Sequence, residues 1–186
     1  MSDKVKNQIE LFHSNNISIE SRSILLSGEV DLDMFQEFFK NFHVLNSTEG
    51  TITIYINSEG GDLDQGKAIY DIIKSSKSYV RGVVYGEASS AASLILQACD
   101  ERAMSKNSYI MIHIGQEGNS GHPDNRARWE AKYKLDSEWM MKVYLEKIKE
   151  KKPRFTKNKL TEMLRFDTIL SAKEAIDLGL LDRVEE

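Results

Sequence analysis

The chain has 186 residues, of which 40% are hydrophobic, and a formal net charge of −4. This length and composition predict one domain that spans residues 1–186 and holds a sizeable core. The acidic balance and the scattered lysines and arginines give no reason to expect a nucleic-acid partner. Every apolar run is too short for a membrane span, and the polar start does not resemble a signal peptide. The single cysteine, Cys99, excludes an internal disulfide and suits a reducing compartment, so we expect a cytoplasmic protein.

The first elements in chain order alternate between strand and helix patterns. Residues 1–16 are weakly patterned, and we expect a flexible N-terminal segment there. Residues 23–28 predict a buried strand that ends at a glycine. In residues 31–42, large apolar side chains recur at helical spacing, and Asp31 is the expected N-cap of that helix. Isoleucines alternate with other residues in residues 51–57, which indicates a strand with one buried face.

The alternation continues through the middle of the chain. Gly60 and Gly61 are expected to turn the chain into a helix over residues 63–73. Residues 79–85 predict a strand, because they are rich in β-branched and aromatic side chains, and an apolar helix follows from Ser90. A further strand is predicted for residues 109–113. Strands that alternate with helices need crossover connections, so the pattern predicts an α/β fold with a mostly parallel sheet.

Helical patterns dominate the second half of the sequence. A capping box at Ser171 and Glu174 opens a last helix that ends near Gly179. Residues 126–149 predict a long helix that is apolar over more of its circumference than one core contact needs. Such a helix either meets another subunit or is buried on both faces within one chain, and we expect the first. Its large apolar residues are Trp129, Tyr133, Trp139, Met140, Met141, Val143 and Tyr144.

Residues 61–67 match the glycines and the lysine of a phosphate-binding loop between a strand and a helix. However, Ala68 stands where that motif needs a hydroxyl group for magnesium. Glu59, Asp62 and Asp64 would also place carboxylates beside a polyanion. Each such repulsion would be on the order of a few kcal/mol. We therefore interpret this segment as a tight glycine turn that exposes backbone N–H groups.

Ser90 would stand at the start of a helix, where unpaired backbone N–H groups and the helix dipole favour developing negative charge. This position suits the nucleophile of an acyl transfer. Serines at helix starts also act as caps, so a purely structural role for Ser89, Ser90 and Ser93 stays open.

Nucleophilic catalysis needs a base and an orienting acid beside the serine. His113 is the natural base, because it ends an apolar strand at a sheet edge where the active sites of parallel sheets gather. Asp167, in the loop before the capping box, can serve as the acid or can be an exposed loop carboxylate. The remaining histidines have weakly patterned, helical or polar surroundings without a matching partner, and they are His13, His43 and His122.

Four segments of the sequence resemble the proteolytic subunit of the Clp protease family. Residues 86–91 resemble its G-x-A-x-S segment, and residues 111–113 resemble its M-I-H segment. Residues 55–61 resemble its Y-I-N-S-P-G-G turn, and residues 167–180 resemble its D-x-x-L-S-A-x-E-A-x-x-x-G-L ending. The matches and their flanking elements extend over residues 24–184 in the order and spacing of the family.

The resemblance implies a ClpP/crotonase-like α/β fold of stacked βαβ units with a projecting long helix. It implies a catalytic triad of Ser90, His113 and Asp167, with the backbone N–H groups of Gly61 and Ala91 as the oxyanion hole. It also implies a serine endopeptidase that acts on unfolded polypeptides inside a heptameric ring, doubled to fourteen chains and fed by an AAA+ ATPase unfoldase. No metal or organic cofactor is implied. The chain order serine, histidine, aspartate does not suit an α/β-hydrolase.

The sequence departs from the family pattern at three places. Glu59 replaces the proline of the glycine turn and brings a carboxylate near the expected oxyanion hole. Ser89 precedes Ser90, which leaves two hydroxyl groups to choose from. Residues 114–121 lack the family's Q-P-x-G-G segment, which pairs with substrate and joins rings. Three alternatives stay open: a catalytically silent scaffold, a crotonase-type acyl-CoA enzyme, and a processing protease that acts without an ATPase.

Overall fold

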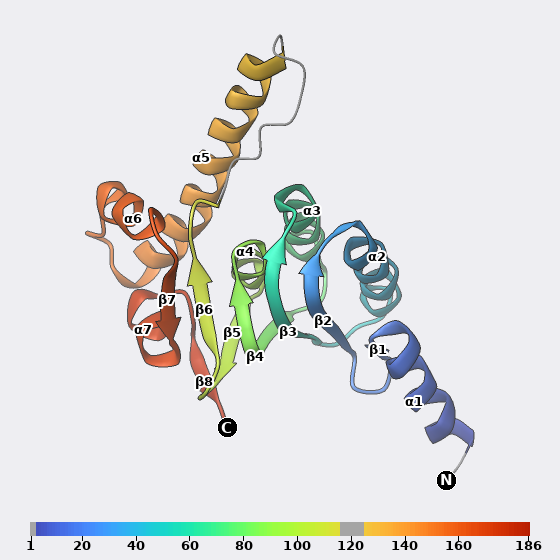
Figure 1. Ribbon diagram of the computed structural model, residues 1–186. Helices are drawn as coiled ribbons and strands as arrows, with labels where there is room; N and C mark the ends of the chain where they lie inside the picture. The colour runs from blue at the N-terminus through green and yellow to red at the C-terminus, as the bar shows by residue number, and fades with distance from the viewer. Residues whose placement is uncertain (1–2, 116–124) are drawn as a thin grey trace.

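The computed structural model describes residues 3–115 and 125–186 of the chain (Figure 1). The departure from the family pattern at residues 116–121 therefore lies outside the described residues, and so does His122. Among the described residues, no helix combines the length and the apolar character needed to cross a membrane.

The strands of the described chain form one mixed sheet in the order β1-β2-β3-β4-β5-β8, with β6 beside β4 and β7 beside β6. The pairs β2–β3, β3–β4, β4–β5, β4–β6 and β5–β8 are parallel, whereas β1–β2 and β6–β7 are antiparallel. The strand bounds are β1 (Ile17–Ser18), β2 (Ser23–Val30), β3 (Ile52–Gly61), β4 (Val80–Ser89), β5 (Glu101–Ser105), β6 (Tyr109–Ile112), β7 (Thr168–Ser171) and β8 (Arg183–Glu185).

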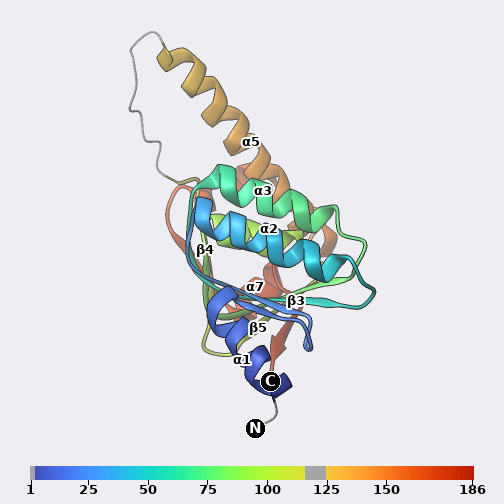
Figure 2. The same cartoon turned by 90° about the vertical axis from the view of Figure 1, so that its right-hand side faces the viewer.

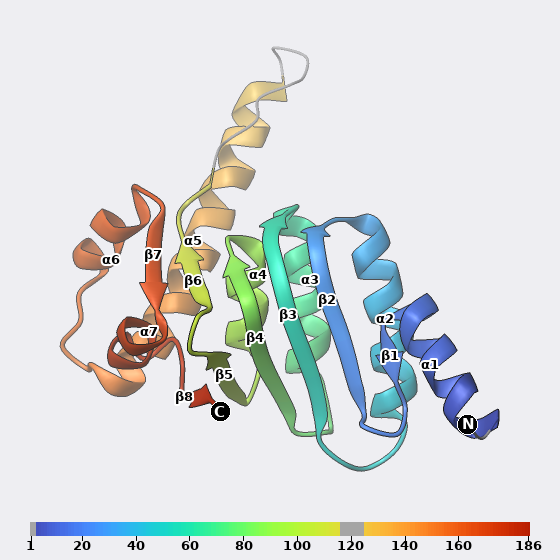
Figure 3. The same ribbon diagram turned by 60° about the horizontal axis from the view of Figure 1, so that its bottom comes forward.

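Helices α2, α3 and α4 cover one face of the sheet, as Figure 3 shows from below. Helix α5 leaves the body of the molecule, and its N-terminal half projects into free space (Figure 2). The helix bounds are α1 (Asp3–Asn15), α2 (Leu32–Asn46), α3 (Leu63–Lys74), α4 (Ala91–Ala98), α5 (Arg126–Lys151), α6 (Lys157–Leu164) and α7 (Ala172–Leu178).

The core lies between the sheet and these helices, and it follows the predicted patterns. Ile52, Ile54 and Ile56 of β3 are all at most 1% exposed, which confirms the predicted buried face. Helix α4 is buried along its whole length, because it lies between the sheet, α3 and the base of α5. The predicted mixed α/β fold with a mostly parallel sheet is confirmed.

The predicted helix ends are also confirmed. The Asp31 carboxylate accepts a hydrogen bond from the backbone N–H of Met34 at 2.8 Å and so caps α2. Ser171 and Glu174 form the full capping box of α7. Gly179 ends that helix at φ = 95°, a left-handed conformation that favours glycine.

Several elements differ from the prediction. Residues 3–15 form α1, which was not predicted although Val5, Ile9 and Phe12 follow helical spacing. The flexibility of residues 1–16 stays a prediction. The second half is not purely helical, since it contributes β7 and β8 to the sheet. These strands, like β5, are short and gain their backbone hydrogen bonds from distant partners, so local periodicity misses them.

The apolar residues of α5 divide between two surroundings. Met140, Met141, Val143 and Tyr144 are at most 7% exposed within this chain. The expectation that these four face another subunit is therefore wrong, because the C-terminal half of α5 packs against α4 and α6. Trp129 is 43% exposed and lies on the projecting half of the helix.

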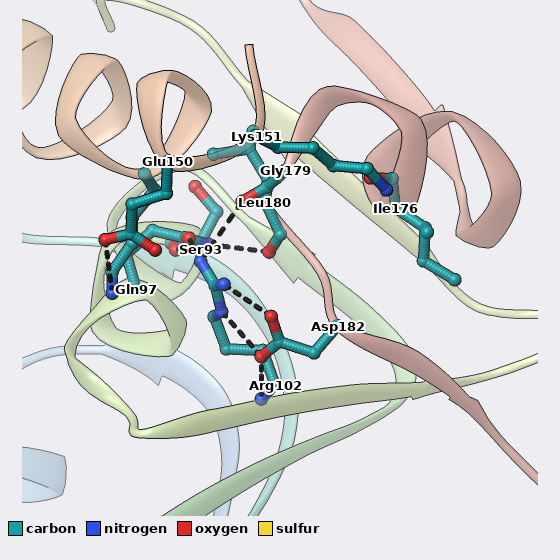
Figure 4. Close-up of polar contacts among 10 residues, drawn as sticks. Ser93, Gln97, Arg102, Glu150, Lys151, Ile176, Gly179, Leu180 and Asp182 are labelled. Atoms are coloured by element: carbon teal, nitrogen blue, oxygen red, sulfur yellow. Dashed lines mark hydrogen bonds and ion pairs between the residues drawn. The ribbon is translucent and has the colours of Figure 1, made fainter. Parts of the chain in front are cut away.

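A buried arginine ties the C-terminal segment to the sheet (Figure 4). Arg102 of β5 is 5% exposed and donates to both carboxylate oxygens of Asp182, at 2.6 and 3.0 Å. It also donates to the Gln97 side chain of α4 at 2.8 Å and to the carbonyl of Gly179 at 3.3 Å. Burial would raise the pKa of Asp182, but the hydrogen bonds and charge of Arg102 outweigh it and hold that pKa below its ordinary value.

Candidate active site

Ser90 occupies the sharp turn between β4 and α4 in an unusual backbone conformation. Its φ of 52° and ψ of −121° lie in a region that residues with a Cβ rarely adopt. The turn is held by a hydrogen bond from the Ser90 N–H to the Met111 carbonyl at 2.9 Å. It also depends on Gly60, where an added Cβ would lie only 2.5 Å from the Ser89 carbonyl oxygen and 2.8 Å from the Ser90 Cβ. The absence of a side chain at Gly60 in β3 therefore leaves the space that the Ser90 turn occupies.

His113 lies between Ser90 and Asp167. Its Nε2 is 2.8 Å from the Ser90 Oγ, and its Nδ1 is 2.9 Å from an oxygen of Asp167. Because the Asp167 carboxylate can only accept, the network assigns the ring proton to Nδ1 and leaves Nε2 to accept from the serine hydroxyl. This arrangement can move a proton from the serine to the imidazole.

The strand register explains why these distant residues meet. Strand β6 pairs with β4 on one side, with Met111 opposite Ser89, and with β7 on the other, with Ile112 opposite Thr168. Since β7 runs antiparallel to β6, the residue before β7 comes beside the residue after β6. Those residues are Asp167 and His113. The His113 side chain is 22% exposed and that of Asp167 is 68% exposed, so the cluster opens to solvent at the aspartate.

Ser89 is turned away from this cluster. It is 2% exposed, and its hydroxyl donates to an oxygen of Glu87 at 2.6 Å. The Tyr109 hydroxyl donates to the same oxygen at 2.8 Å. Of the two adjacent serines, Ser90 is therefore the one whose hydroxyl reaches the histidine. The thiol of Cys99 is buried, and burial raises its pKa to about 12, so it is not a competing nucleophile.

A cleft of about 520 Å³ opens in front of Ser90. Gly61 and Ala91 both line it. Ala91 is the first residue of α4, and the first N–H groups of a helix have no partner within the helix. At Gly61, an added Cβ would lie 2.5 Å from the Val30 carbonyl oxygen of β2, so the close approach of these strands requires glycine. Ser90, His113, Gly61 and Ala91 thus line one cleft, and Asp167 lies behind His113, outside the lining of that cleft.

The cleft is lined by more acidic than basic side chains, which come from the end of β3, the start of α3 and α5. Four carboxylates and one lysine line the cleft in addition to His113: Glu59, Asp62, Asp64, Asp136 and Lys132. The sequence interpretation did not find Asp136, which is 7% exposed and forms ion pairs with Lys67 of α3 and with Lys132. Burial would raise the pKa of Asp136, but its hydrogen bonds to the two lysines lower it on balance. No local pattern could have revealed this cluster, since Lys67 and Asp136 are far apart in the sequence.

The same contacts speak against a phosphate site at residues 61–67. The Asp62 carboxylate accepts from the backbone N–H groups of Asp64 and Gln65 at 2.7 and 3.2 Å, so it occupies the helix start that a phosphate would need. Lys67, the lysine of the apparent motif, is paired with Asp136. The geometry therefore favours the glycine-turn interpretation.

Comparisons with known proteins extend these observations. The family profile described as Clp protease matches residues 6–186. The ATP-dependent Clp protease proteolytic subunit 2 of Treponema denticola is 29% identical over 170 residues, which cover 89% of this chain and 82% of the relative. The ATP-dependent Clp protease proteolytic subunit of Deinococcus radiodurans is 31% identical over 171 residues, covering 89% and 81% of the two chains. A solved structure of a ClpP1 mutant from Listeria monocytogenes matches with a TM-score of 0.79 at 25% identity, over 90% of this chain and 93% of that chain.

The fold and the family match define the class as a peptidase with the ClpP-like α/β fold. The chain belongs to the Clp protease family, since the family profile covers nearly its whole length. The resemblance noted in the sequence and the ClpP/crotonase-like fold are therefore confirmed.

Proposed function

We propose that this chain is a serine endopeptidase in which Ser90 is the nucleophile, His113 is the general base and Asp167 orients the imidazole. The observation that carries the proposal is the pair of contacts at His113, 2.8 Å to the Ser90 Oγ and 2.9 Å to Asp167. The first distance is within the range that proton transfer requires, and the second is that of a hydrogen bond that can orient the ring.

In the proposed reaction, His113 Nε2 accepts the Ser90 proton as the serine oxygen bonds to the carbonyl carbon of the scissile peptide. The negative charge that forms on the carbonyl oxygen is stabilised by the N–H groups of Gly61 and Ala91. His113 then gives its proton to the leaving amine, and an acyl-enzyme results. Water attacks this ester while His113 takes the water proton, and that proton returns to Ser90 when the acid product leaves. The scheme needs no cofactor.

We further propose that the chain folds as one domain and that its copies assemble into an oligomeric chamber, a heptameric ring doubled to fourteen chains. The projecting half of α5 supports an intermolecular role, because Trp129 is 43% and Leu135 66% exposed there. Two relatives carry the printed name of proteolytic subunit of an ATP-dependent Clp protease. On that basis we propose an AAA+ ATPase unfoldase as partner and unfolded polypeptides as substrates.

Labelling with a fluorophosphonate probe followed by peptide mapping tests the nucleophile directly. We expect the probe on Ser90 in the unmodified protein and in the matched control Ser89→Ala. Ser90→Ala should lose the label and about three or more orders of magnitude in peptidase rate, as removal of a triad member does. A label on Ser89 would refute the assignment, and a folded but unlabelled protein without peptidase activity would favour the silent scaffold.

A further inference from the structure

The carbonyl oxygen of Ser90 accepts three hydrogen bonds. Two come from the backbone N–H groups of Ser93 and Leu94, at 3.0 and 3.4 Å. The third and shortest comes from the side-chain hydroxyl of Ser93, at 2.7 Å. The backbone of the nucleophile is thus anchored by a side chain one helical turn further along α4.

The Ser93 hydroxyl is itself held by Tyr144 of α5. The two oxygens lie 2.6 Å apart, and both residues are 0% exposed. A serine hydroxyl has one proton, and here that proton goes to the Ser90 carbonyl, so Tyr144 must be the donor of the second bond. Burial raises the pKa of Tyr144 far above its ordinary value, which keeps this phenol protonated. The bonds therefore run in one direction, from Tyr144 through Ser93 to the Ser90 carbonyl.

This direction matters because of the geometry of the peptide unit. The Ser90 carbonyl and the Ala91 N–H belong to one peptide group, which is planar and, like all described peptide bonds, not cis. In a trans peptide, the C=O and N–H bonds point in opposite directions. Hydrogen bonds that hold the Ser90 carbonyl in place therefore also determine the direction of the Ala91 N–H. The unusual φ and ψ of Ser90 make such anchoring necessary, since that conformation persists only when its surroundings hold it. Bonds to the carbonyl also polarise the amide and strengthen its N–H as a donor.

We propose that Tyr144 and Ser93 are positioning residues that aim the Ala91 N–H at the oxyanion. This inference rests on the proposed function, because the oxyanion hole is part of it. An oxyanion forms only on the way to the tetrahedral intermediate, so the two hydroxyl groups stabilise the transition state and leave substrate binding unchanged. A purely structural hydrogen bond would instead contribute to folding and leave the turnover of the folded enzyme alone.

Single and double substitutions separate these two roles. Ser93→Ala should lower kcat by about fivefold to tenfold, the range expected of one lost hydrogen bond, with KM unchanged. Tyr144→Phe should lower kcat by a smaller factor, because Ser93 keeps its own bond to the carbonyl. The double variant should behave like Ser93→Ala alone, since Tyr144 acts only through Ser93. Matched controls are Tyr70→Phe, which removes a half-buried phenol of α3 outside the cleft, and Ser23→Ala in β2; both should keep the kcat of the unmodified protein.

A peptide aldehyde gives a readout that a structural role would not change. Its carbonyl carbon bonds to the Ser90 Oγ, the carbonyl π bond opens, and the serine proton passes to His113, so the adduct places an oxyanion at the Ala91 N–H. We expect the Ki of the aldehyde to rise by the same factor as kcat/KM falls in each variant. Circular dichroism and thermal melts confirm that only folded protein is compared.

The relay is refuted if both variants fold and retain the kcat and aldehyde Ki of the unmodified protein, or if their effects add in the double variant. A change confined to KM would also refute it. Failure of the proposed function looks different, because the unmodified protein would then neither hydrolyse peptides nor react with the fluorophosphonate probe.

Discussion

Ser90 adopts a backbone conformation that its own side chain disfavours, and neighbouring residues hold it there. Gly60 leaves space beneath the turn, and the Met111 carbonyl accepts the Ser90 N–H. The result is a hydroxyl that reaches His113 at 2.8 Å while the adjacent Ser89 stays bonded to Glu87. At the scale of single residues, the site thus depends on the missing Cβ of Gly60 as well as on the catalytic side chains.

Gly60→Ala tests this dependence. The new Cβ would meet the Ser89 carbonyl at 2.5 Å, backbone that cannot move without displacing Ser90. We expect peptidase activity to fall by about a hundredfold or more, the scale of a reacting group misplaced by about 1 Å. Gly28→Ala is the matched control, because its φ of +88° is equally unsuited to alanine but its Cβ has nothing within 4 Å. It should cost about 1 kcal/mol of stability and keep the activity; equal activity losses in both variants would contradict the steric argument.

Glu59 should influence which peptides are cut. It lines the cleft beside Asp62, whereas the other two cleft carboxylates, Asp64 and Asp136, are paired with lysines. Cationic residues near the scissile bond should therefore be favoured over acidic ones. We expect Glu59→Gln to lower the ratio of kcat/KM for a lysine-containing peptide to that for its glutamate counterpart by about twofold to fivefold, as an exposed charge allows. Salt should reduce the ratio in the unmodified protein in the same way. An unchanged ratio in Glu59→Gln would exclude this role.

At the scale of elements, the short strands decide the geometry. Strand β6 has only residues Tyr109–Ile112, yet it pairs with both β4 and β7 and thereby brings three separate segments of the site together. Strand β8 joins the edge of the sheet next to β5, where Arg102 and Asp182 link the end of the chain to α4. Elements with few residues are therefore stabilised by contacts that are distant in sequence.

The Arg102–Asp182 pair predicts a pH-dependent contribution to stability. The folded pKa of Asp182 is lowered, so its stabilising effect is fully present above the unfolded value of about 3.9 and is lost as the pH falls through the folded pKa. We expect Asp182→Asn to cost about 1–3 kcal/mol at pH 7, because it leaves a buried guanidinium without its charged partner. The difference from the unmodified protein should shrink below about pH 4.

Urea unfolding at several pH values checks this expectation. The control is Asp177→Asn, which removes an exposed ion pair to Lys173 and should change the free energy of unfolding by less than about 0.5 kcal/mol at any pH. A difference between Asp182→Asn and the unmodified protein that stays constant from pH 7 to pH 3 would contradict the linkage.

At the scale of the whole molecule, the projecting half of α5 is the feature that supports the proposed assembly. Its C-terminal half is part of the core, whereas its N-terminal half projects from the body (Figure 2). In this half Leu135 is 66% exposed, and Trp129 is 43% exposed and also lines the cleft. Burying those side chains against other subunits would stabilise an assembly through the hydrophobic effect.

Trp129→Glu and Leu135→Glu should therefore shift the assembly toward smaller species, because an unpaired charge at an interface costs several kcal/mol. Sedimentation velocity or mass photometry at micromolar concentration measures the distribution. Trp129→Phe is the control, since it keeps an apolar ring and should retain the assembly. An unmodified protein that persists at one or two times the 21.2 kDa chain mass would refute the chamber, though not the peptidase. Two glutamate variants that assemble normally would show that this face lies outside the interfaces.

Most of the longer strands and helices, the Asp31 cap and the Ser171–Glu174 capping box could be predicted from the sequence, because each rests on residues a few positions apart. The motifs around Ser90 and His113 were equally readable, and their catalytic roles stay a prediction. Only the tertiary structure decided which serine hydroxyl meets the histidine, since that depends on the direction of side chains across a sheet. The tertiary structure also showed that Tyr144 lies in the core and not at the expected interface. The spacing of apolar residues along a helix shows which side chains share a face, but it does not show which element packs against that face. The short strands β5, β7 and β8 and the ion pairs of Asp136 join residues distant in sequence, and such contacts leave no local pattern.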